Sequence, residues 1–114
     1  PGLASRFPKT IFFPDYTDDE LWEIFVMTGD RAGYHPDEGA EAAVKAWFAS
    51  VPRDKGFGNG RLARNLVEAA EEERELRLSA VDDLSGLTES ELMTITAADV
   101  RAAVGDLTAA LRAG

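Results

Sequence analysis

A glycine-rich segment that leads into a helix carries the residues best suited to chemistry. It reads Gly-Phe-Gly-Asn-Gly-Arg-Leu-Ala-Arg-Asn over residues 56–65, which places Arg61 and Arg64 in the first helical turns. A helix N-terminus bears partial positive charge, so helix physics favours Asp or Glu there over Arg. A bound anion removes this conflict, and phosphate is the usual anion at a helix start. The segment therefore predicts contact with a nucleotide or another phosphate.

The charge distribution sets this segment in a small basic region of an acidic chain. The 114 residues have a net charge of −9, yet residues 1–13 and 53–64 together hold six basic side chains and one acidic one. The other residues hold six basic and 20 acidic side chains. An acidic surface repels nucleic acid and anionic membranes at long range, so neither is predicted as a partner. A compact phosphate ligand or an acidic partner fits the basic region.

Simpler interpretations stay open on chemistry alone. Arg61 and Arg64 also suit an exposed helical pair bonded to Asp54 or a glutamate, and Arg6 suits a flexible tail. The sequence contains no GxxxxGK[ST], GxGxxG or HExxH motif and no cysteine. With His35 as the single histidine, no metal site is predicted.

Length and hydropathy predict one soluble, cytoplasmic domain. A chain of 114 residues builds one modest core, and no apolar run approaches the roughly 18 residues of a membrane span. The chain begins Pro-Gly without a methionine, which is typical of a part of a longer protein. Residues 10–14 form a short apolar run stopped by proline and predict one isolated strand, centred on residues 11–13.

Capping signals and apolar periodicity predict helices from residue 17 onward. Thr17 and Glu20 have the spacing of a capping box, Gly33 marks the end of this first helix, and Pro36 suits the first position of the second. The second helix has the clearest apolar stripe of the chain, formed by Ala40, Ala43, Val44, Trp47, Phe48 and Val51.

The third helix is predicted from an N-cap at Asn59 to about Val81. Its predicted inner face consists of Leu62, Leu66, Ala69, Leu76 and Ala80. Its glutamates predict a solvated outer face, with Glu73 and Arg77 at a supporting i, i+4 spacing.

Two further capping devices follow. Thr88 with Glu91 predicts a short helix, and Thr96 with Asp99 predicts the start of a final helix. The final helix is predicted to bury Val100, Ala103, Val104, Leu107 and Leu111. The fold class is therefore all-α: a small bundle of four to five helices, preceded by the isolated strand.

Several short motifs occur in an order that resembles the C-terminal end of an AAA+ ATPase module. They are Gly-Leu-Ala-Ser-Arg-Phe at 2–7, Ile-Phe-Phe-Pro-Asp-Tyr at 11–16, Asp-Glu-Leu at 19–21, Gly-Asn-Gly-Arg at 58–61 with Arg-Asn at 64–65, and Leu-Met-Thr-Ile-Thr-Ala-Ala-Asp-Val at 92–100. The series covers almost the whole chain. It is most similar to the branch containing the rubisco activase CbbX, the sporulation protein SpoVK and the type VII secretion ATPase EccA.

The resemblance implies a role for each basic residue. Arg6 matches the arginine finger, the catalytic residue that reaches the γ-phosphate bound by a neighbouring ring subunit. Arg61 matches the sensor 2 arginine, which contacts nucleotide phosphates in its own subunit. Arg64 and Asn59 are implied as further nucleotide-site residues, with a contact to the large subdomain as the alternative role of Arg64. Gly60 stands where relatives often carry alanine, which loosens the helix start.

The resemblance also implies the domain organisation and the partners. Residues 1–16 would be the C-terminal edge of the large α/β subdomain, and residues 17–114 the helical lid. The parent would be a hexameric ATPase that uses ATP and Mg²⁺ to remodel a protein substrate. Its partners would be its own large subdomain, the neighbouring subunits and that unknown substrate.

The chain on its own is predicted to show no ATPase activity and no tight nucleotide binding. It is also predicted either to dimerise through residues 8–16, because an apolar strand with free edges invites pairing, or to be disordered there. The alternative to the lid is a free-standing acidic helical module for protein interaction. A helix-turn-helix nucleic-acid binder is disfavoured because such proteins carry a broad basic face.

Overall fold

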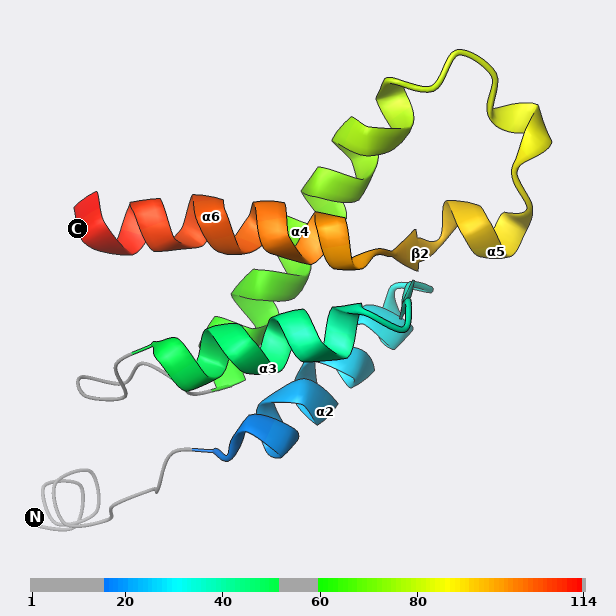
Figure 1. The fold of residues 1–114 in the computed structure, drawn as a ribbon. Coiled ribbons are helices and arrows are strands. Elements are labelled where there is room, and N and C mark those ends of the chain that lie inside the picture. Colours follow the sequence, from blue (N-terminus) through cyan, green and yellow to red (C-terminus); the bar gives the residue numbers. More distant parts are fainter. Residues whose placement is uncertain (1–15, 52–59, 114) are drawn as a thin grey trace, which may run out of the picture.

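The computed structural model describes residues 16–51 and 60–113 (Figure 1). Its longer helices are α2 (Asp18–Arg31), α3 (Ala40–Ser50), α4 (Gly60–Ser79) and α6 (Ala97–Ala113). Its shorter elements are β1 (His35–Pro36), η2 (Leu84–Gly86), α5 (Glu89–Leu92) and β2 (Thr94–Ile95). The prediction of a small helical bundle is confirmed. The strand predicted at 11–13 and the dimer predicted through 8–16 involve residues that lie, apart from Tyr16, outside the described ranges.

Local capping chemistry sets the helix starts, as the sequence predicts. The Thr17 hydroxyl accepts a hydrogen bond from the Glu20 N–H, and the Glu20 carboxylate accepts one from the Thr17 N–H. Thr88 and Glu91 form the same reciprocal pair ahead of α5. At α2, Gly33 follows the C-cap with a φ of 89°, a left-handed conformation that favours glycine.

The core lies where α2, α3, α4 and α6 meet, with α4 crossing behind α3 and α6 in Figure 1. Its fully buried large side chains come from all four helices and β2: Leu21, Phe25, Val44, Phe48, Leu66, Val67, Ile95 and Val100. The predicted stripe on α3 is confirmed, because Ala40, Val44, Trp47, Phe48 and Val51 are buried and Ala43 packs against them. On α6, Val100 and Ala103 are buried as predicted, and the Leu111 side chain lies outside the described part.

Pro36 does not begin the second helix. His35–Pro36 instead pairs in parallel with Thr94–Ile95, and α3 begins at Ala40. The N–H groups of His35 and Asp37, on either side of the proline, donate to the Met93 and Ile95 carbonyls at 3.1 and 2.9 Å. Proline has no N–H and tolerates this position, where its own nitrogen is not required in the ladder.

The inner face predicted for α4 is wrong in its second half. Leu62 and Leu66 are buried and Ala69 is partly buried, but Leu76 is 62% exposed and Ala80 is exposed. The buried row instead contains Leu62, Ala63, Leu66, Val67, Ala70 and Leu78. Beyond Ala70 the inward positions are shared by the buried Leu78 and by Arg74 and Arg77, which donate hydrogen bonds to the Leu92 and Thr94 carbonyls. The helix ends at Ser79, two residues before the predicted end.

Residues 79–93 form an arm that stands off from the rest of the bundle in Figure 1. The segment contains η2 and α5, and none of its residues is buried. The arm returns to the bundle at β2, where Ile95 enters the core. None of the helices in the described ranges has the length and apolar character needed to cross a membrane.

Candidate functional site: the start of helix α4

The first turn of α4 carries arginine instead of the usual acid. Among the helices that the structure describes, α2, α3, α5 and α6 each have Asp or Glu in the first turn, whereas α4 has none. Arg61 and Arg64 are both exposed there, while Leu62 and Ala63 between them are buried in the core. The core contacts therefore fix the rotation of α4 so that both guanidinium groups face outward at its positive end.

Gly60 brings this helix start close to the beginning of α2. An added Cβ at Gly60 would lie 3.5 Å from Tyr16 Cε2 and 3.6 Å from Ile24 Cδ1. It would also lie 3.3 Å from Nη1 of Arg64, so the Arg64 side chain folds back over the first residue of α4. Alanine at this position requires only a small shift at the flexible end of Arg64. The Arg64 guanidinium group and the Tyr16 ring thus both lie next to Gly60.

The predicted site residues are only partly within the described ranges. The structure brings Arg61 and Arg64 together on one helix turn. Arg6 and Asn59 lie outside the described residues. The residue set at the start of α4 suits an anion, because it combines two arginines with a first turn that contains no carboxylate. An arrangement of this kind can hold an anion such as phosphate.

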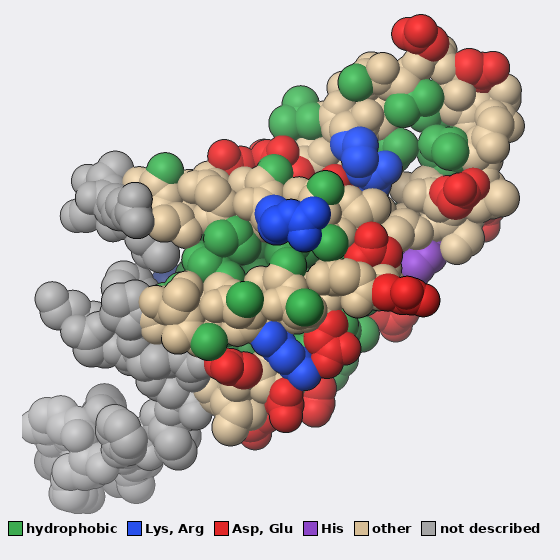
Figure 2. Space-filling model, in the orientation of Figure 1, with side chains coloured by type: hydrophobic (Ala, Val, Ile, Leu, Met, Phe, Trp, Pro, Cys, Tyr) green, Lys and Arg blue, Asp and Glu red, His purple; other side chains and the backbone are tan. Residues whose placement is uncertain are grey.

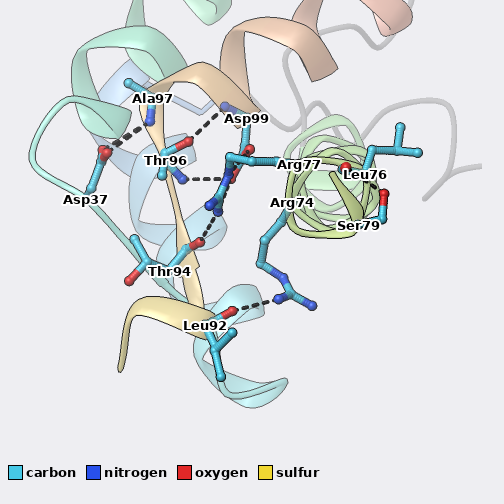
Figure 3. A network of polar contacts seen from close by, with 10 residues as sticks. All are labelled: Asp37, Arg74, Leu76, Arg77, Ser79, Leu92, Thr94, Thr96, Ala97 and Asp99. Carbon is cyan, nitrogen blue, oxygen red and sulfur yellow. Dashed lines mark hydrogen bonds and ion pairs between the residues drawn. The ribbon is translucent and has the colours of Figure 1, made fainter. Parts of the chain in front are cut away.

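A buried ion pair fixes the far half of α4 against α6 (Figure 3). Arg77 Nε and Nη2 donate to the two carboxylate oxygens of Asp99 at 3.0 and 3.1 Å, and Nη2 also donates to the Thr94 carbonyl. Asp99 is 3% exposed and accepts a further bond from the Thr96 N–H at 2.9 Å, while the Thr96 hydroxyl accepts from the Asp99 N–H. The predicted capping role of Asp99 is confirmed, but Arg77 pairs with Asp99 and not with Glu73.

Two further polar residues, Arg74 and Asp37, bind the segments that flank the short strands, and neither of them was predicted from the sequence. Arg74 donates to the Leu92 carbonyl at 2.6 Å, and its guanidinium lies over the Tyr34 ring, 4.7 Å from the centroid. The Asp37 carboxylate accepts from the N–H groups of Gly39, Ala40 and Ala97, at 2.9 to 3.2 Å. One carboxylate thus caps α3 and α6 together. The spacing of Asp37 and Gly39, which is typical of an Asx-turn, could have predicted the contact with α3 from the sequence.

The glutamates of α4 are crowded enough to disturb their ionisation. Glu73 shares a hydrogen bond with Asp106 of α6, and that bond, with partial burial and nearby negative charge, raises the pKa of Glu73 above its ordinary 4.5. Burial, followed by the charge of Glu68, raises the pKa of Glu71. The folded state therefore binds these protons more tightly than the unfolded chain does.

Glu73→Gln should make the chain more stable at neutral pH than the wild type. The stabilising effect of protonated Glu73 is complete below about pH 4.5 and is lost as the pH rises through its raised folded pKa. Glutamine keeps a hydrogen-bond donor for Asp106 without the charge, so the advantage should shrink towards acid pH. Thermal unfolding near pH 4.5 and near pH 7.5 measures this. Glu23→Gln on α2 removes the same charge elsewhere, and an equal pH response from it would contradict the interpretation.

The rest of the described surface offers a groove but no metal site. Within the described part of the chain, no group of three or more His, Asp or Glu side chains is placed to hold a metal ion. A groove of about 660 Å³ lies between α3 and α6, lined by small residues such as Ala42, Ala46 and Gly105, by Trp47 and by Arg101. The lining contains neither Arg61 nor Arg64.

His35 takes a structural position. It lies in β1, and its Nε2 is within hydrogen-bonding distance of the Ser90 and Thr94 hydroxyls, at 3.2 and 3.0 Å. It does not mark the entry to a helix, because α3 begins only at Ala40. Its contacts link β1 with α5 and β2.

The bundle, with its cationic helix start, has the features of a small helical lid. The family model described as AAA lid domain matches residues 17–110. The chain therefore belongs to the AAA lid domain family, and the predicted resemblance to the lid of AAA+ ATPases is confirmed.

Relatives point to the same branch. The chain is 39% identical over 119 residues to the ESX-3 secretion system protein EccA3 of Mycolicibacterium smegmatis, covering 93% of this chain and 19% of that protein. It is 36% identical to stage V sporulation protein K of Bacillus subtilis, over 88% of this chain and 31% of the relative. It is 33% identical to a CfxQ homolog of Pyropia yezoensis, over 88% of this chain and 33% of that relative. The chain thus spans between a fifth and a third of these relatives.

Proposed function

We propose that this lid supplies charge to the ATP site of its parent AAA+ ATPase. In this proposal Arg61 contacts the phosphates of ATP bound by the same subunit, and Arg64 assists it. Arg6 reaches the nucleotide of the neighbouring subunit in a hexameric ring, and Asn59 caps α4. The observation that carries the proposal is the pair of exposed arginines in the first two turns of α4, whose first turn contains no acid. Residues 1–16 would then belong to the large subdomain and residues 17–114 to the lid.

The chemistry of such a site is electrostatic. Hydrolysis of ATP with Mg²⁺ places negative charge on phosphoryl oxygens, which positive side chains stabilise. The chain's own contribution is position: the buried Leu62 and Ala63 orient α4, and its outward face holds the two guanidinium groups. This placement costs some helix stability, because positive charge at a helix N-terminus is unfavourable without an anion.

The same helix can transmit a change at the nucleotide to the rest of the lid. α4 is fixed to α6 by the Arg77–Asp99 pair, and α3 is fixed to α6 through Asp37. A pull on Arg61 therefore moves the bundle as one body, which suits hinge-type domain motion. We infer that the parent uses this motion to remodel a protein substrate in the cytoplasm.

Mixing two inactive variants of the parent ATPase should restore activity. Arg6→Ala removes the residue that is proposed to act on the nucleotide of the neighbouring subunit. Arg61→Ala removes the residue that is proposed to act on the nucleotide of its own subunit. Each uniform assembly should be inactive. In a random equal mixture, about one quarter of the sites combine an intact Arg61 with an intact Arg6 from the next subunit. Steady-state ATP hydrolysis against mixing ratio measures the recovery.

The control is a mixture of either variant with a subunit that carries both changes, which contains no complete site. If the mixture of Arg6→Ala and Arg61→Ala subunits is no more active than either uniform assembly, the two arginines do not act from different subunits. Recovery in the control mixture would contradict both assignments.

A further inference from the structure

The arm and the adjoining end of α4 carry three of the large hydrophobic side chains that are exposed in the described part of the chain. Leu76 is 62% exposed, and Val81 and Leu84 are each 41% exposed. All three lie within nine consecutive residues, and Figure 3 shows Leu76 directed away from Arg74 and Arg77 on the opposite side of α4. Burying such side chains is favourable, so a surface that groups them is suited to contact with another molecule.

The charges around these side chains are of one sign. Residues 68–93 contain nine acidic side chains and two basic ones, Arg74 and Arg77. Both arginines are turned inward and engaged, Arg74 with the Leu92 carbonyl and Arg77 with Asp99. The outward side of residues 68–93 therefore carries carboxylates, and neither basic side chain of this segment lies on that side. Figure 2 shows acidic side chains at the tip of the arm with hydrophobic ones beside them.

The turn that presents Leu84 is fixed in shape and charge. The Asp83 carboxylate accepts hydrogen bonds from the Ser85 hydroxyl and the Ser85 N–H, at 2.6 and 2.9 Å. These bonds lower the pKa of Asp83, the hydroxyl contributing most, and keep it ionised. A fixed turn loses little conformational entropy on binding, which favours a specific contact.

Charge decides which kind of molecule fits this surface. Nucleic acid and anionic membranes would be repelled by the carboxylates. A second copy related by twofold symmetry would set the same acidic patch against itself. A protein surface with an apolar centre and lysine or arginine around it matches both the hydrophobic residues and the charge.

We propose that Leu76, Val81 and Leu84, with Glu72, Glu75, Asp82 and Asp83 around them, form a docking surface for a different protein whose apolar contact patch is bordered by basic residues. The surface is separate from the start of α4 and does not depend on the role of Arg61. It gives the lid a second function, the attachment of a partner at the arm.

A designed peptide can test the surface in place of the natural partner. The probe is a short amphipathic helix with leucine on one face and lysine on the other. Matched peptides replace lysine by glutamate or leucine by serine. We expect the leucine–lysine peptide to shift the backbone NMR signals of residues 72–84, and both matched peptides to bind weakly. Fluorescence anisotropy gives the affinity of each peptide.

The Leu76→Ser/Val81→Ser/Leu84→Ser variant should weaken binding at least about tenfold, since apolar anchors dominate most interfaces. The three side chains are exposed, so the variant should keep the wild-type circular dichroism and melting curve. Met27→Ser, at a 54% exposed residue of α2, is the matched control and should bind normally. Glu75→Gln/Asp82→Asn should weaken binding mainly at low salt.

Three outcomes would overturn the proposal. One is signal shifts centred outside residues 72–84. Another is an equal loss of affinity in Met27→Ser, which would indicate non-specific attraction to an acidic protein. The third is self-association of the chain in sedimentation experiments that the triple serine variant abolishes, which would identify a second copy as the occupant.

Discussion

Replacing Arg61 by alanine in the parent ATPase should lower kcat for ATP hydrolysis by about 100-fold or more, because loss of one preorganised positive donor typically has this effect. The stability of the lid should not fall. Arg61 is exposed, and removing positive charge from the start of α4 is neutral or favourable for the helix. The expected result is a large loss of activity with an unchanged or slightly raised melting temperature.

Arg101→Ala on α6 is the matched control, because it removes an exposed arginine from another helix. It should leave kcat within about twofold of the wild type, as expected for surface substitutions away from a site. Steady-state ATP hydrolysis of the parent and thermal unfolding of the isolated chain supply the two measurements. A drop in lid stability of more than about 1 kcal/mol in Arg61→Ala would identify Arg61 as a structural residue.

Local chemistry made the helix starts predictable. The caps at Thr17, Thr88 and Thr96 each depend on a partner three residues later, so the whole interaction is present in a short stretch of sequence. The apolar stripe of α3 was predictable for the same reason, since its spacing alone defines one face of a helix. The choice of Arg61 and Arg64 as site candidates also came from a local conflict, arginine at the positive end of a helix.

Pairings between residues far apart in the chain leave no comparable pattern in the sequence, so they were not predicted. His35 and Thr94 pair across 59 residues, and Pro36 satisfied the rule for a first helical position equally well. Arg77 has Glu73 at the spacing of a helical ion pair, yet it binds Asp99, because a carboxylate that is almost fully buried requires a partner more than an exposed one does. The inward turn of Arg77 then leaves Leu76 outside, which apolar periodicity assigned to the core.

The candidate site was predictable in type but not in its surroundings. The sequence indicated that Arg61 and Arg64 share the first turns of a helix, which the structure confirms. It did not indicate that Gly60 lies against Tyr16 and Ile24, because that contact depends on how α2 and α4 cross. The roles of Arg6 and Asn59 stay predictions.

Arg77→Met should destabilise the isolated chain by about 3 kcal/mol, because it leaves the Asp99 charge buried without its partner. Losses of about 3–5 kcal/mol are typical when one partner of a buried pair is removed, and the lower end applies because the Arg77 side chain is 35% exposed. Domains of this size have only about 5–15 kcal/mol of stability in total. Urea unfolding followed by circular dichroism measures the loss.

A second variant separates the buried charge from the lost packing. Arg77→Met combined with Asp99→Asn removes both charges, while the asparagine oxygen still accepts from the Thr96 N–H. The double variant should therefore recover at least about half of the lost stability, since the cost lies mainly in the unpaired group and not in the missing bond. Arg101→Met should change stability by no more than about 0.5 kcal/mol. If Arg77→Met behaved like Arg101→Met, the Arg77–Asp99 pair would be worth no more than an exposed ion pair, and the rigid link from α4 to α6 would lose its physical basis.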